Sequence, residues 1–152
     1  MAIVNRTPDS FYDKGATFAI EKAVARADDA IAAGATIIDI GGVKAGPGDD
    51  VSVAEEIDRV VPVIAAVRER HPQATVSVDT WRAAVAEDAI AAGADLIETN
   101  TFGANLPALT DYGIASRASE LASAATKLAR EAADKRTDKP RYVVGSIGPG
   151  TK

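Results

Sequence analysis

Two nearly identical stretches decide the fold of this chain: AIAAGATIIDIGG at residues 30–42 and AIAAGADLIETNTFG at residues 89–103. Each reads as the end of an Ala-rich helix, a glycine that stops the helix, a mostly apolar run, and a polar or glycine-rich loop. Nearly continuous apolar runs are typical of strands that are buried on both faces of a parallel sheet. The repeat therefore predicts a series of β/α units.

The rest of the chain continues this alternation. Apolar residues at helical spacing predict helices over residues 19–33, 53–70, 82–92 and 117–135, and short apolar runs predict strands at 2–5, 36–40, 75–79, 95–99 and 142–146. Such alternation implies a parallel sheet with right-handed crossovers. We expect a partial (β/α)8 TIM barrel of about five strands and four helices, because a full barrel takes about 250 residues. The alternative is an open, doubly wound sheet of the flavodoxin or Rossmann type.

Length and composition exclude several classes of protein. The 152 residues, 47% of them hydrophobic, suit a single α/β domain over residues 1–152. The formal net charge of −5 argues against nucleic acid or an anionic membrane as the main partner. The chain has no Cys, no apolar run long enough to cross a membrane and no signal-peptide pattern, so we expect a cytoplasmic protein without disulfides.

Every expected strand ends in a polar or glycine-rich loop, and in parallel α/β folds ligands bind at the carboxyl ends of the strands. Glycine lets the backbone approach an anion closely, and Asn, Ser and Thr donate hydrogen bonds to phosphate oxygens. A carboxylate such as that of Asp79 can accept hydrogen bonds from the N–H groups of a heterocycle. Any one of these loops could be a plain turn, but five together favour a ligand-binding rim, with the loops at residues 5–11, 39–48, 77–80, 98–101 and 145–150.

Three motifs carry a family resemblance: IVNRTPDSFYDKG at residues 3–15, IIDIGGVKAGPG at 37–48 and SVDTWRA at 77–83. In order and spacing they resemble dihydropteroate synthase, a pterin-binding family of folate biosynthesis, over about residues 1–97. The resemblance implies a TIM barrel, and a transferase that condenses 6-hydroxymethyl-dihydropterin pyrophosphate with p-aminobenzoate and releases pyrophosphate.

The resemblance also implies roles for single residues. Asn5 would contact the pyrophosphate and Mg2+, and Asp79 would bind the pterin. Asp39 is a second candidate for the pterin, with bracing of the adjacent backbone as the alternative. Arg6 and Lys44 are candidates for phosphate binding, although a lone surface base usually does nothing specific. Asn5 could equally cap its own turn.

The second motif departs from the family pattern. The family has Gly-Gly-Glu-Ser-Thr-Arg-Pro-Gly where this chain has Gly41-Gly42-Val43-Lys44-Ala45-Gly46-Pro47-Gly48. The missing Ser, Thr and Arg normally order the loop and seat the second substrate, and Lys44 cannot reproduce the bidentate fork of an arginine. The departure is similar to the divergent second-copy synthases of actinobacteria. We therefore expect the activity of the single chain to be absent or very low.

A second resemblance starts near residue 91. ETNTFGAN at 98–105, LARE at 128–131 and VVGSIGPGTK at 143–152 resemble the homocysteine-binding domain of methionine synthase, which is also a TIM barrel. AAGADLI at 91–97 is common to both families, so we predict a chimera with a synthase-like part at 1–97 and a methyltransferase-like part at 98–152. That domain holds zinc through three cysteines, and a chain without Cys has no such zinc site.

Three functional hypotheses follow from the sequence. The first is a pterin-binding, synthase-like protein that is catalytically incomplete as a single chain and uses Mg2+. The second is a chimeric half-barrel scaffold without activity, which forms a homo-oligomer through its exposed sheet edges. The third and weakest is a homocysteine methyltransferase fragment. Among the aromatic residues, we expect Phe102 and Tyr112 in the core or at a barrel seam and Trp81 at the rim or under the following helix.

Overall fold

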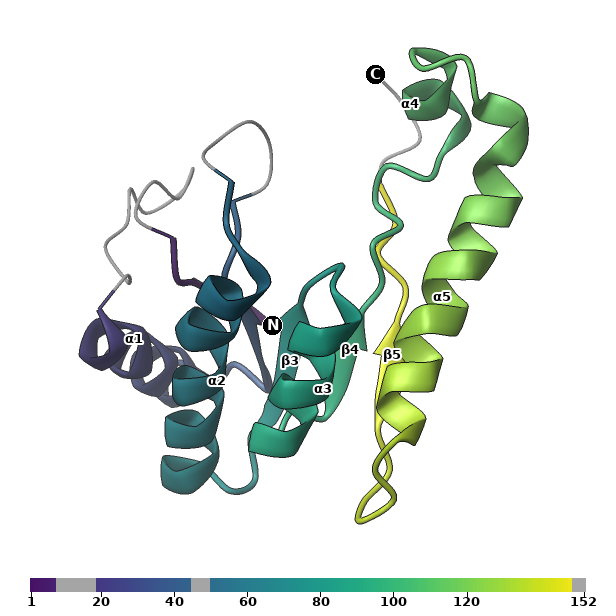
Figure 1. Cartoon of the computed structure of the whole chain (residues 1–152). Helices are drawn as coiled ribbons and strands as arrows, with labels where there is room; N and C mark the ends of the chain where they lie inside the picture. The colour runs from purple at the N-terminus through teal and green to yellow at the C-terminus, as the bar shows by residue number, and fades with distance from the viewer. Residues whose placement is uncertain (8–18, 45–49, 149–152) are drawn as a thin grey trace.

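The computed structural model describes residues 1–7, 19–44 and 50–148. Its five strands form one parallel sheet in the order β1-β2-β3-β4-β5, with bounds Ala2–Asn5, Ile37–Gly41, Thr75–Asp79, Leu96–Glu98 and Tyr142–Val144. The crossover helices are α1, α2, α3 and α5, with bounds Ile20–Ala32, Val53–Arg70, Ala83–Ala92 and Ala118–Asp134. Figure 1 shows these helices following one another along the sheet in chain order.

This strand order confirms the partial barrel and excludes the doubly wound alternative. A doubly wound sheet reverses its strand order at a switch point, whereas here each strand pairs with its neighbour in the sequence. The neighbouring helix pairs α1–α2, α2–α3 and α3–α5 also contact one another. The chain is therefore wound in a single direction, as in a TIM barrel.

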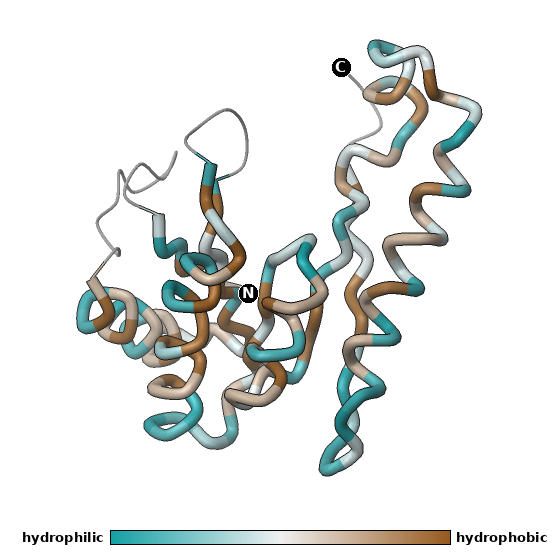
Figure 2. Tube along the Cα trace, viewed as in Figure 1, coloured by the Kyte–Doolittle hydropathy of each residue, from teal (hydrophilic) through white to brown (hydrophobic). Residues whose placement is uncertain are grey.

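The core lies between one face of the sheet and the helices. The strand residues on this face are apolar. One register row across the sheet consists of Val4, Ile40, Val78, Ile97 and Val143. Figure 2 shows the matching apolar stretches along the strands and helices. Burial on both faces, as expected from the sequence, is only partly observed, because the opposite face leaves Ile3 and Tyr142 59% and 61% exposed.

The segment between β4 and α5 contains helical turns that lie outside the predicted helices. It contains a short helix α4, Leu106–Thr110, and a 3-10 turn η1, Ala115–Arg117. Asn105 caps α4 by accepting a hydrogen bond from the backbone N–H of Ala108 at 3.0 Å. The chain after β4 also stays beside the chain after β5, where Thr101 Oγ1 donates to the carbonyl of Ser146 at 2.7 Å.

Two expectations about aromatic residues are wrong, because both residues lie on the segment between β4 and α5. Phe102 and Tyr112 lie on this projecting segment and are 60% and 78% exposed, so neither belongs to the core of the described chain. Trp81 lies at the rim, as expected, and is 52% exposed. Within the described ranges, no helix combines the length and the apolar character needed to cross a bilayer.

Candidate functional site at the carboxyl ends of the strands

The register of the sheet gathers the polar strand ends into one row. Asn5 pairs with Gly41, Gly41 with Asp79, and Asp79 with Glu98. Because side chains alternate along a strand, this row faces away from the helices, on the same face as Asp39 two residues earlier. The sequence prediction that these residues share one rim is confirmed by this pairing.

Asp39 and Ser77 form a buried polar pair beneath this row. They are register partners on β2 and β3, and their exposed fractions are only 5% and 0%. Within the described chain, Asp39 Oδ1 and Ser77 Oγ make no well-formed hydrogen bond, and the Ser77 hydroxyl is the one polar side chain that lowers the pKa of the Asp39 carboxyl. An unpaired buried polar atom costs free energy, so such atoms are typical of sites that a ligand completes. For bracing of the backbone by Asp39, the alternative raised by the sequence, the described residues offer no hydrogen bond to Asp39 Oδ1.

The electrostatics of this face favour a ligand that brings hydrogen-bond donors. Burial raises the pKa of Asp39 to about 6, and the charges of Asp79 and Glu98 add to the rise while the Ser77 hydroxyl opposes it. Asp79 lies at the open end of β3, where burial, followed by the charges of Glu98 and Glu56, raises the pKa of its carboxyl as well. N–H donors placed here would relieve the repulsion among these carboxylates.

Asn5 ends β1 beside a glycine that leaves it room. A Cβ at position 41 would lie 3.1 Å from Asn5 Oδ1, a close contact that would make the Asn5 side chain shift by a few tenths of an ångström. Lys44 is half-buried and lies within the second loop, while residues 8–18 and 45–49, including the Asp9 of the first motif, lie outside the described residues. The placement of Asn5 at the end of the row is compatible with its predicted phosphate and Mg2+ contacts.

Arg6 is turned toward α2 in this structure. The residue is 7% exposed, and its Nη1 donates to the carbonyl of Arg59 at 3.0 Å. Burial and the charge of Arg59 lower its pKa. The structure thus gives the Arg6 side chain a contact with a helix, and its predicted role in phosphate binding stays a prediction.

Sequence reasoning missed a set of charged residues on α2 and after β3. Glu56, on the first turn of α2, is fully buried and accepts from Thr80 Oγ1 and Arg82 Nη1, each at 2.6 Å. Arg59, one turn later, donates to the carbonyl of Gly42 at 2.9 Å. Since Glu56 lies 24 residues from Thr80 in the sequence, no local pattern announces this contact.

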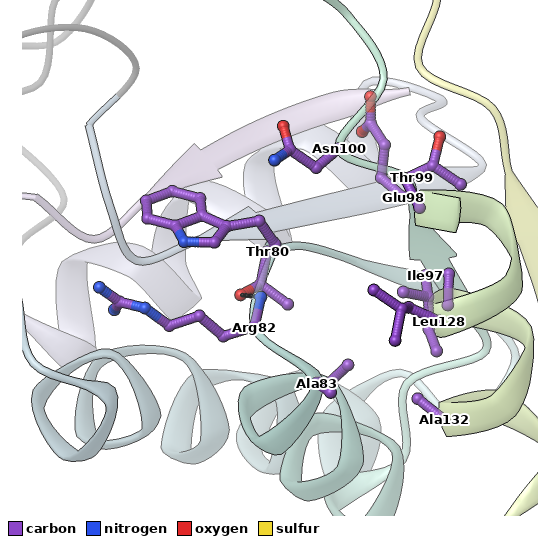
Figure 3. Close-up of a pocket in the computed structure, with 13 residues that line it drawn as sticks. Thr80, Arg82, Ala83, Ile97, Glu98, Thr99, Asn100, Leu128 and Ala132 are labelled. Carbon is purple, nitrogen blue, oxygen red and sulfur yellow. Dashed lines mark hydrogen bonds between the residues drawn. The ribbon is translucent and has the colours of Figure 1, made fainter. Parts of the chain in front are cut away.

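A separate pocket of about 110 Å³ lies on the helix side of the sheet, between α3 and α5 above the end of β4. Figure 3 shows Ile97, Leu128 and Ala132 on one side of it and Arg82 on the other. Arg82 also lies over the ring of Trp81, with the guanidinium carbon 4.9 Å from the ring centroid. Because Ile97 points to the helix side, this pocket is distinct from the face that carries Asp39.

Comparison with known sequences decides the family. The sequence model of the family described as "Pterin binding enzyme" matches residues 1–138. The chain belongs to the pterin-binding enzyme family. It is 58% identical over 111 residues to the "Inactive dihydropteroate synthase 2" of Mycobacterium tuberculosis strain H37Rv, a match that covers 73% of this chain and 35% of the relative.

Solved structures of this family agree with the fold. The dihydropteroate synthase of Yersinia pestis with a sulfonamide drug is 48% identical, with a TM-score of 0.61 over 64% of this chain and 35% of that chain. The Xanthomonas albilineans enzyme in complex with 7,8-dihydropteroate is 40% identical, with a TM-score of 0.55 over 73% and 41%. The chain thus spans about a third of the length of its curated relatives.

The second resemblance gains no support from these comparisons. The pterin-binding family model continues to residue 138, well past residue 97, where the sequence resemblance was expected to end. The predicted chimera with a methionine synthase segment therefore stays a prediction, and the family boundary placed at residue 97 is too early.

Proposed function

We propose that this pterin-binding family member binds a pterin on the exposed face of its sheet. Asp39 and Asp79 would accept hydrogen bonds from the heterocycle, and Asn5, Arg6 and Lys44 would contact the pyrophosphate. The observation that carries the proposal is the buried Asp39–Ser77 pair, in which Asp39 Oδ1 and Ser77 Oγ make no well-formed hydrogen bond within the described chain. A pterin edge, rich in N–H groups, would supply the donors that these oxygens lack.

Mg2+ would join this site with Asn5 as its protein ligand. Among the described residues, no three His, Cys, Asp or Glu side chains lie close enough together to hold a metal. That fits a cation that keeps several waters and is bound through substrate phosphates and one or two protein oxygens. Mg2+ would neutralise charge on the pyrophosphate, and the chain would contribute the carboxamide oxygen of Asn5 at the strand end.

We also propose that the 152-residue chain does not catalyse the condensation with p-aminobenzoate. Pyrophosphate is a good leaving group, so catalysis depends on cations placed to stabilise its developing charge. The second loop lacks the arginine that the family pattern has there, and the described rim carries the carboxylates of Asp39, Asp79 and Glu98 instead. The name of the mycobacterial relative, inactive dihydropteroate synthase 2, is in line with this view.

The test is a calorimetric titration of the chain with 6-hydroxymethylpterin pyrophosphate and Mg2+. We expect saturable binding that Asn5→Ala and Asp79→Ala both weaken, and no dihydropteroate when p-aminobenzoate is added. Asp88→Ala removes an exposed carboxylate from the last turns of α3 and serves as the control, which should bind as the wild type does. No heat from a folded sample would contradict the proposal and favour a scaffold without activity, and formation of dihydropteroate would contradict the lack of catalysis.

A further partner is a second copy of this chain. We propose self-association through the two edges of the sheet, because β1 and β5 each pair on one side only in the described chain. Ile3 and Tyr142, exposed on these two strands, would be covered by added strands.

A further inference from the structure

The first turns of α2 contact all three rim segments that carry candidate ligand residues. Glu56 accepts from Thr80, which directly follows Asp79. Arg59 donates to the carbonyl of Gly42, two residues before Lys44. The carbonyl of Arg59 in turn accepts from Arg6, the neighbour of Asn5, at 3.0 Å. One helix end therefore holds the ends of β1, β2 and β3.

Glu56 is the centre of this arrangement. Its carboxylate is fully buried, and both of its oxygens are engaged, one by the Thr80 hydroxyl and the other by the Arg82 guanidinium. Thr80 Oγ1 also accepts from the backbone N–H of Arg82 at 3.2 Å, which closes a small ring of hydrogen bonds after β3. Short charge-assisted hydrogen bonds in a buried place restrict the geometry of the groups that make them.

The same network reaches the far end of the longer connection between β2 and α2. Arg82 Nη2 donates to the carbonyl of Val51 at 2.6 Å, while Arg59 holds the carbonyl of Gly42 on the near end. Both ends of the loop that contains Lys44 are thus bonded to arginines whose other partners lie on α2. Glu56 and Arg59 therefore link both described flanks of this connection to Thr80, the residue after Asp79.

We infer that Glu56 is a positioning residue of the pterin site: it fixes Thr80 beside Asp79, and through Arg82 it fixes the end of the connection between β2 and α2. The inference rests on the proposed pterin binding. Glu56 itself is buried on α2 and does not reach the ligand face, so its effect on a ligand passes through these two residues.

The charge of Glu56 acts on Asp79 separately from its hydrogen bonds, so the rescue of binding by Thr80→Ser is the readout that tests positioning, and the pKa of Asp79 reports the charge. Among the described residues, the carboxylates that act on Asp79 are Asp39 on β2, Glu98 on β4 and Glu56 on α2. The nearest cation along the chain is Arg82, three residues after Asp79. Burial and the charges of Glu98 and Glu56 raise the pKa of Asp79. Replacing Glu56 by a neutral residue should therefore lower the pKa of the Asp79 carboxyl, which carboxyl carbon NMR measures directly.

The experiment compares four variants by titration with 6-hydroxymethylpterin pyrophosphate and Mg2+. Thr80→Val removes the hydroxyl and keeps the Glu56–Arg82 pair, Thr80→Ser keeps the hydroxyl, and Glu56→Gln removes the charge. Asp95→Asn is the matched control: Asp95 is a part-buried carboxylate that Arg68 and Lys139 pair at the opposite end of the sheet. We expect the Asp95→Asn variant to lose about as much stability as Thr80→Val does, while the rim residues keep their contacts.

We expect Thr80→Val and Glu56→Gln to weaken binding at least about tenfold, as for the loss of a hydrogen bond to a charged group. Thr80→Ser and Asp95→Asn should bind within about twofold of the wild type, and Glu56→Gln should lower the pKa of Asp79. If the wild type binds and Thr80→Val binds equally well, the positioning role is wrong while pterin binding stands. If the wild type itself does not bind, the proposed function is wrong and the inference is wrong with it. If Glu56→Gln does not fold, the comparison of pterin binding by Thr80→Val and Thr80→Ser tests the positioning role.

Discussion

The ionised carboxyl of Asp39 lowers the free energy of unfolding at neutral pH. Its pKa is raised from 3.8 to about 6 in the folded protein, so the folded state holds a proton that the unfolded chain has already lost. Stability therefore falls as the pH rises from about 4 to about 6 and stays lower above that range, by roughly 3 kcal/mol for a shift of this size. A buried carboxyl that lowers stability in this way is in line with the trade-off between stability and function that binding sites commonly show.

Asp39→Asn is therefore expected to stabilise the protein at pH 7.5, by up to about 3 kcal/mol, and to change stability little at pH 4. The amide does not titrate, so the penalty on ionisation disappears. Urea unfolding at the two pH values measures the difference. Asp88→Asn makes the same chemical change at an exposed position and should have little effect at either pH. A variant that is less stable than the wild type at pH 7.5 would contradict this account.

At the scale of elements, α2 packs so closely on the end of β2 that a side chain at position 42 has no room. A Cβ on Gly42 would lie 2.8 Å from Val60 Cγ1 and 3.3 Å from the carbonyl oxygen of Glu56. Val60 is fully buried and the second contact is backbone, so neither can give way easily. The glycine permits the helix approach on which the contacts of Glu56 and Arg59 depend.

Gly42→Ala should accordingly destabilise the protein by about 1–3 kcal/mol, the usual cost of forcing extra atoms into a packed site. Gly145→Ala is the matched control, because a Cβ there meets nothing within 4 Å. Its stability should stay the same or rise slightly, since alanine restricts the unfolded chain. Chemical unfolding of both variants tests the comparison, and equal midpoints would rule out close packing of α2 on Gly42.

The elements that the sequence predicts well are those with their own local signals. The strand Thr75–Asp79 and the helix Val53–Arg70 have the predicted bounds, because apolar spacing alone marks them. Gly93 ends α3 at a φ of +117°, a conformation that other residues avoid. By contrast, α4 has only five residues, too few for a periodic pattern, and Asn105 before Leu106 and Pro107 was the one available start signal.

The candidate site also has one part that the sequence predicts and one part that it does not. That Asn5 and Asp79 would share a rim follows from the parallel arrangement of strands, which the alternation predicts. The inward turn of Arg6 and the burial of Glu56 do not follow from it, because they depend on which side chains of α2 reach residues more than twenty positions away. Such contacts form only when the helix packs on the sheet, and no periodic pattern in the sequence predicts them.

At the scale of the whole molecule, the described sheet has two open edges and an apolar residue exposed on each. Ile3 on β1 and Tyr142 on β5 lie in the same register row of the ligand-side face, through Asp39, Ser77 and Leu96. Unpaired strand edges offer backbone N–H and C=O groups to another chain, and adjacent apolar side chains add area that is worth burying. Both features favour pairing of one copy with another.

We therefore expect the 152-residue chain to form dimers or larger species at concentrations on the order of 100 μM, where contacts of modest area become populated. Tyr142→Lys places a charge on the β5 edge and should shift the protein toward monomer. Tyr112→Lys introduces the same charge on the projecting segment between α4 and η1, where Tyr112 is 78% exposed, and should leave the association unchanged. Sedimentation velocity measures all three proteins over a range of concentrations. A wild type that stays monomeric throughout would show that the open edges do not pair, and equal loss of association in both variants would place the contact elsewhere than at β5.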